Sequence, residues 1–118
     1  MKKPGKYKFY FRPAHDSENL LIEFISGVEN ADFGKDIFDA IKNISPKIIG
    51  QEDLWMNDEV LYSVDSTFGI FTLSKDVWNL AFIMNENNQP VLTKINELLI
   101  KDDRFQKIEV NSDSREKV

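Results

Sequence analysis

Three apolar segments that follow one another at short spacing constrain the fold more than any other feature of the chain. They span residues 59–64, 68–73 and 77–84. Polar triplets at 65–67 and 74–76 join them, and residues of this kind favour chain reversal. Strands with such short connections pair with their neighbours, so this region predicts an antiparallel meander. The third segment is apolar on both faces and is predicted to be the central strand.

Residues 32–44 have the clearest helical pattern. Asp32 is placed to cap the N-terminus, and apolar residues recur at helical spacing along the segment. Pro46 ends the helix because the residue before a proline avoids the helical conformation. The polar face carries Asp36 and Asp39, which the pattern turns towards solvent.

A second helix and two terminal strands are predicted outside this region. The helix has Asn88 as its cap and Pro90 in the first turn, where a missing N–H costs nothing, and it ends near Ile100. Alternating aromatic residues predict a strand over residues 6–12. A shorter alternation predicts a last strand over residues 105–110.

Two segments are harder to assign. The apolar spacing of residues 16–28 fits both a helix and a strand centred on residues 21–25. The helix is slightly favoured, because five apolar residues fall on one helical stripe and Gly27 lies where a helix could end. Residues 47–58 show no clear period and are interpreted as a connection with an exposed Trp55.

The whole chain predicts one domain of the α+β class. Its 118 residues, 42% of them hydrophobic, are enough to bury a core without disulfide or metal support. We expect a mostly antiparallel sheet of four to five strands, with the meander at 59–84 in its centre, packed against two or three helices. The domain is expected to occupy residues 1–118, with frayed ends at about 1–5 and 111–118.

Composition argues against several classes of function. The chain has no Cys, one His and no Gly-rich phosphate loop, so we expect no catalytic set, no metal site and no cofactor. Its net charge of −5 disfavours nucleic acid and anionic membranes as partners, because both bind cationic surfaces. The chain shows neither a run of about 18 apolar residues nor a signal-peptide pattern, so a cytoplasmic location is expected. The oligomeric state stays open.

Charge is distributed unevenly along the chain. The first twelve residues carry five cations and no acid, whereas residues 16–65 carry twelve acids and three bases, a net charge of −9. Such a density would attract a basic partner if it gathered on one exposed side. Trp55 lies among these acids, and tryptophan is enriched at binding hot spots. The predicted partner-binding residues are Glu52, Asp53, Trp55, Asp58, Glu59 and Asp65, with Asp36 and Asp39 as outlying contributors.

This profile, an acidic α+β domain without cysteine or a catalytic set, resembles the small immunity proteins that bacteria pair with secreted or contact-delivered toxins. The resemblance covers the whole chain, without a shared motif. It implies a protein that binds a cognate basic toxin, for example a nuclease, and masks its active site. Two alternatives stay open. One is a small carboxylate-based enzyme or ligand-binding domain, and the other is an adaptor or regulatory module with a different protein partner.

Overall fold

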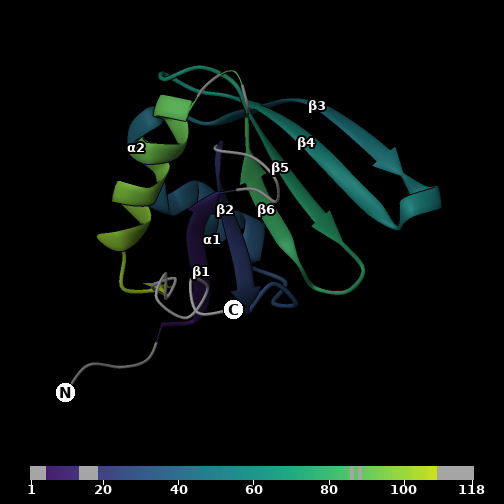
Figure 1. The fold of residues 1–118 in the computed structure, drawn as a ribbon, viewed down its shortest axis with the longest axis horizontal. Helices are drawn as coiled ribbons and strands as arrows, with labels where there is room; N and C mark the ends of the chain where they lie inside the picture. Colours follow the sequence, from purple (N-terminus) through teal and green to yellow (C-terminus); the bar gives the residue numbers. More distant parts are fainter. Residues whose placement is uncertain (1–4, 14–18, 86, 88, 109–118) are drawn as a thin grey trace, which may run out of the picture.

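Figure 1 shows the fold as a computed structural model that describes residues 5–13, 19–85, 87 and 89–108. The elements in this part of the chain are β1 (Tyr7–Pro13), β2 (Leu20–Ser26), α1 (Phe33–Ala40), the 3-10 helix η1 (Lys42–Ile44), β3 (Lys47–Leu54), the 3-10 helix η2 (Trp55–Asn57), β4 (Glu59–Asp65), β5 (Phe71–Asp76), β6 (Ala81–Met84), α2 (Gln89–Ile100) and β7 (Phe105–Lys107). The strands form one sheet in the order β3-β4-β5-β6-β2-β1-β7. Neighbours are antiparallel except β1 and β7, which are parallel.

The α+β class is confirmed, as are a mostly antiparallel sheet and two α-helices. The expected four to five strands are too few, because the described residues form seven. The two strands that the prediction left out are β2 and β3. One adds a strand beside the centre of the sheet, and the other extends the sheet at its edge.

Both helices pack on one face of the sheet. The sheet side chains buried beneath them include Phe9, Ile22, Phe24, Val64, Phe71, Leu73, Ala81 and Ile83. Phe24 lies at the centre of an aromatic group, with its ring centroid 5.1 Å from that of Phe33 on α1 and 6.1 Å from that of Phe105 on β7. The β3–β4 hairpin extends away from both helices (Figure 1). The sheet therefore has a covered half and a projecting half.

The segment 16–28 contains strand β2, so the preference for a helix is wrong. β2 lies between β1 and β6 and pairs antiparallel with both, so its two neighbours supply the backbone partners that a helix would have supplied itself. Ile22 and Phe24 face the core. Gly27 forms a turn with φ 88° and does not end a helix, and a Cβ there would lie 2.5 Å from the carbonyl oxygen of Lys6.

The segment 47–58 forms β3 and η2, so its interpretation as a connection is also wrong. β3 pairs with β4 from end to end, with Lys47 opposite Asp65 and Leu54 opposite Glu59. It is an edge strand and is largely exposed. No alternation of buried and exposed positions therefore marks it in the sequence.

The meander is confirmed, but β5 and β6 begin three and four residues later than predicted. The turn between them lies at 77–80, because Asp76 organises it. Its Oδ1 accepts hydrogen bonds from the backbone N–H of Trp78 at 2.9 Å and of Leu80 at 3.1 Å. Asn79 in this turn has φ 64°, a conformation that Asn tolerates. β6 is the fourth of the seven strands, so the predicted central position of this segment is confirmed.

The remaining elements follow the predictions, and β1 is shifted by one residue from the predicted strand at 6–12. α1 ends at Ala40 and η1 follows it, and Asp32 takes the N-cap position without a side-chain capping hydrogen bond. α2 is confirmed, with Pro90 in its first turn, while its expected cap, Asn88, lies outside the described residues. β7 confirms the start of the last strand. Residues 109–110 and most of the ends that were predicted to fray lie outside the described part of the chain.

Candidate functional site

Two turns meet at the end of the projecting half of the sheet (Figure 1). η2 joins β3 to β4, and residues 77–80 join β5 to β6. The backbone N–H of Val77 donates a hydrogen bond of 3.1 Å to the carbonyl oxygen of Asp58. This bond fixes the two turns against each other, so side chains from distant parts of the sequence share one surface.

Large apolar side chains are exposed on this surface. Trp55, Met56, Val77 and Trp78 are between 63% and 80% exposed. Contiguous exposed apolar residues are uncommon on soluble monomers and mark contact surfaces. The predicted exposure of Trp55 is thus confirmed, and a second tryptophan is exposed on the adjoining turn.

Carboxylates lie beside two of these apolar side chains, Trp55 and Val77. Asp53, Asp58, Glu59 and Asp76 line a shallow hollow of about 410 Å³. Glu59 accepts a hydrogen bond from the hydroxyl of Ser74, whereas Asp53 and Asp58 are exposed. We call the combined surface the hairpin tip, and it consists of Asp53, Trp55, Met56, Asp58, Glu59, Asp76, Val77 and Trp78.

The structure brings four of the predicted binding residues together and separates the others. The four that belong to the hairpin tip are Asp53, Trp55, Asp58 and Glu59. Glu52 is exposed but points to the face of β3 opposite to that of Asp53, since successive strand residues alternate. Asp65 is exposed at the other end of β4, opposite Lys47. The predicted set is therefore only partly one surface.

Asp36 is buried, so its expected position on the solvent face of the helix is wrong. Its Oδ2 accepts hydrogen bonds from the hydroxyl of Tyr7 at 2.6 Å and the ammonium of Lys6 at 3.1 Å, and its Oδ1 accepts one from Arg104 at 3.2 Å. Asp39 is exposed, but it forms an ion pair with Arg104 at 2.8 Å. Cations thus neutralise both carboxylates, which do not add free negative charge to a binding surface.

These contacts shift the pKa values of Asp36, Tyr7 and Asp102 from their usual values. The hydrogen bond from Tyr7, assisted by Lys6 and Arg104, holds the pKa of Asp36 below its usual value. Burial and the hydrogen bond to Asp36 raise the pKa of Tyr7 to about 12. Arg104 also binds Asp102, through Nε at 2.9 Å and Nη2 at 2.6 Å, and these hydrogen bonds lower the pKa of that carboxyl. We call Lys6, Tyr7, Asp36, Asp39, Asp102 and Arg104 the Asp36 network, which ties β1, α1 and the loop before β7 together.

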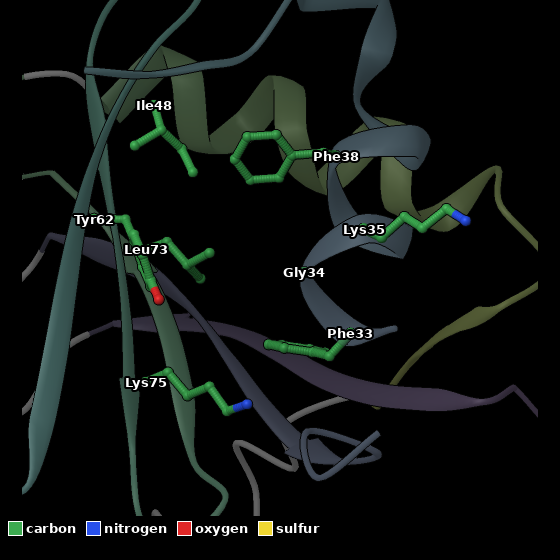
Figure 2. Close-up of a pocket in the computed structure, with 8 residues that line it drawn as sticks. All are labelled: Phe33, Gly34, Lys35, Phe38, Ile48, Tyr62, Leu73 and Lys75. Carbon is green, nitrogen blue, oxygen red and sulfur yellow. The ribbon is translucent and has the colours of Figure 1, made fainter. Parts of the chain in front are cut away.

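A second hollow, the α1 cavity, lies between α1 and the outer strands (Figure 2). Its volume is about 430 Å³. The residues that line it are Phe33, Gly34, Lys35, Phe38, Ile48, Tyr62, Leu73 and Lys75. Tyr62 and Lys75 also line the acidic hollow of the hairpin tip, so the two sites are adjacent.

Asp76, Val77 and Trp78 were not predicted to belong to this surface, because the apolar pattern of residues 77–84 indicated a central strand that contains Trp78. The sequence Asp76-Val77-Trp78-Asn79 could have predicted a turn at this position. Asp accepts hydrogen bonds from backbone N–H groups two residues ahead, and Asn tolerates positive φ, so the pattern is typical of a turn. A turn at this position would have predicted an exposed Trp78.

Within the described residues, no group of three or more His, Cys, Asp or Glu side chains is arranged to hold a metal ion. No helix in the same part of the chain is long and apolar enough to cross a membrane. Comparisons with protein-family models, with curated proteins and with solved structures found no match. The function is therefore inferred from the geometry of this chain.

Proposed function

We propose that this protein is an acidic protein-binding module whose hairpin tip engages a basic protein, and that it acts in the cytoplasm as an immunity protein against a cognate basic toxin. One observation carries the proposal. Trp55 and four carboxylates line one hollow where two hydrogen-bonded turns meet, and a second exposed tryptophan, Trp78, lies on one of these turns. This combination supplies both contact area and charge for a partner.

The tip combines two components of a binding hot spot. Trp55 and Trp78 are 75% and 65% exposed, so a partner that covers them would remove a large apolar area from water. The surrounding carboxylates would attract Lys and Arg on that partner and speed the encounter. Because two strand connections support the tip, little conformational entropy would be lost on binding.

Fewer carboxylates are available to a partner than the acidic segment 16–65 suggests, because the fold pairs some of them with cations. Asp36 and Asp39 are bound by Arg104, and Glu23 pairs with Arg12 at 2.7 Å. Glu29, Asp32, Glu52 and Asp65 are exposed as well, and the carboxylates of the tip differ from them because they lie beside the exposed Trp55. The proposal therefore requires charge changes at the tip to act more strongly than equal changes elsewhere.

A toxin is the partner that this surface suits best. Toxins that cleave nucleic acid bind phosphates through cationic active sites, and an acidic surface complements such a site. An inhibitor of this kind needs no catalytic groups of its own. The rest of the molecule then serves as a rigid support for the tip.

The test uses the basic domain encoded by the reading frame adjacent to this gene as the partner. Co-expression with the wild-type chain should protect cells from that domain. The double variant Asp53→Lys with Asp58→Lys should lower the association rate constant at least about tenfold at low salt and weaken its salt dependence. Stopped-flow mixing and a growth assay give the two readouts.

The matched control is the double variant Asp65→Lys with Glu97→Lys. Each reversal adds two charges, so both double variants have a net charge of −1 in place of −5. Asp65 and Glu97 are exposed and lie outside the tip. Equal slowing by the two variants would overturn the assignment of the tip. Binding through the tip without protection of the cells would retain the protein-binding module and reject the immunity role.

A further inference from the structure

We propose that the α1 cavity is a binding site for a small aromatic carboxylate. Its volume of about 430 Å³ lies within the range of about 300 to 1,000 Å³ that is typical of small-molecule sites. Most of its wall is apolar, with one cationic side chain directed into it (Figure 2). The cavity adjoins the hairpin tip and shares Tyr62 and Lys75 with its hollow, but the proposal does not rest on the contact with a basic protein.

Aromatic side chains on opposite sides of the cavity define the shape of the ligand. Phe33 and Phe38 approach from α1, and Tyr62 approaches from β4, with Leu73 between them (Figure 2). Rings on facing walls of a cavity can pack against the faces and edges of a further ring. An apolar aromatic body is therefore the best match for the wall.

Lys75 supplies the charge that selects an anion. Its ammonium lies 6.0 Å from the centroid of the Phe33 ring, and Figure 2 shows the side chain reaching from β5 towards Phe33 at one end of the cavity. It forms no ion pair with a carboxylate among the described residues. Lys35 also borders the cavity, but its ammonium points to the far side of α1 (Figure 2). One cation beside apolar walls suits a ligand with a single negative charge at one end.

Gly34 gives an independent reason to regard the cavity as a ligand site. It lies in the first turn of α1 and borders the cavity, and a Cβ at this position would meet no atom within 4 Å. Neither packing nor a positive φ therefore requires glycine here, although glycine weakens a helix relative to alanine. The lack of a side chain keeps this side of the cavity open.

Binding of 3-phenylpropionate and of its neutral analogue 3-phenylpropanamide to the intact protein tests the proposal. Isothermal titration calorimetry should show saturable binding of the carboxylate at millimolar or lower concentration, and at least about tenfold weaker binding of the amide. Lys75→Met should remove this difference by weakening only the carboxylate. The matched control Lys35→Met should leave both affinities unchanged.

The variant Gly34→Phe places a ring in the cavity and should abolish binding of both compounds. Its thermal unfolding and backbone amide NMR spectrum report whether the fold is retained, and Lys75→Met supplies a second test that leaves α1 intact. The double variant Asp53→Lys with Asp58→Lys should bind 3-phenylpropionate at least as tightly as wild type, which separates this site from the hairpin tip. Equal affinity for acid and amide, or no saturable binding to the wild-type protein, would overturn the proposal.

Discussion

Two acid-rich regions of this protein use their carboxylates in opposite ways. In the Asp36 network, a buried carboxylate accepts hydrogen bonds from a tyrosine, a lysine and an arginine. In the hairpin tip, Asp53 and Asp58 are exposed beside Trp55, and Trp78 is exposed on the adjoining turn. The comparison teaches that acid density along a sequence does not predict a binding surface, because it does not show which acids the fold neutralises.

The helix layer explains why the two regions differ. α1 and α2 cover the part of the sheet that contains β1, β2, β6 and β5, together with the end of β4 at Val64, and the network closes one edge of that layer. The β3–β4 hairpin extends beyond the helices (Figure 1), so side chains at its end are not covered. The covered half should therefore determine stability, and the projecting half should determine binding.

Truncation of one aromatic residue in each half should give the largest difference in unfolding free energy. Phe24→Ala removes a fully buried ring that contacts the rings of Phe9, Phe33 and Phe105, so the unfolding free energy should fall by about 4 kcal/mol. Trp78→Ala should change it by no more than about 0.5 kcal/mol. Urea denaturation followed by circular dichroism measures both values. A loss above about 2 kcal/mol for Trp78→Ala would place that residue in the core and end the contrast.

In the covered half, the sequence predicted every element except β2. Alternation in residues 6–12 and helical spacing in 89–100 are visible because one face of each element is buried. β3 was missed because an exposed edge strand carries no such alternation. β2 was misassigned because its apolar residues suit either a helix or a strand, and only pairing with β1 and β6 decides between them.

The candidate site was predicted in part for a related reason. Asp53, Trp55, Asp58 and Glu59 are close in sequence, so one acidic segment around a tryptophan identified them together. The contribution of residues 76–78 depends on contact between two turns, which local sequence does not show. The burial of Asp36 depends on a tyrosine 29 residues away, and no helical periodicity contains that information.

The pH dependence of the unfolding free energy should also distinguish the Asp36 network from the hairpin tip. We expect this effect to be smaller than that of Phe24→Ala. Asp36 and Asp102 have pKa values below normal in the folded state. Their stabilisation is complete above the unfolded-state value of about 4 and is lost as pH falls through the folded-state values. The pKa of Tyr7 is raised to about 12, so its contribution should decline as pH rises above about 10. Urea denaturation across this pH range measures the profile.

Two matched variants test whether the Asp36 network causes the loss of stability at low pH. Asp36→Asn should lower the unfolding free energy by about 2 kcal/mol at pH 7, because hydrogen bonds to a charged group are lost, and it should flatten the profile below about pH 4. Asp58→Asn in the tip should change the value by no more than about 0.5 kcal/mol and keep the slope. If Asp36→Asn keeps the full acid slope, the network does not cause it.

The smallest expected effect is a gain in stability from Gly34→Ala. The residue lies in the first turn of α1 with space for a Cβ, so alanine should raise the unfolding free energy by about 0.5 kcal/mol through helix propensity. Gly27→Ala is the matched control and should destabilise, because φ is 88° and the Cβ would lie 2.5 Å from a carbonyl oxygen. Thermal and urea unfolding measure both. A loss of stability in Gly34→Ala would mean that this glycine serves the packing of the covered half, and the argument that it keeps the α1 cavity open would fail.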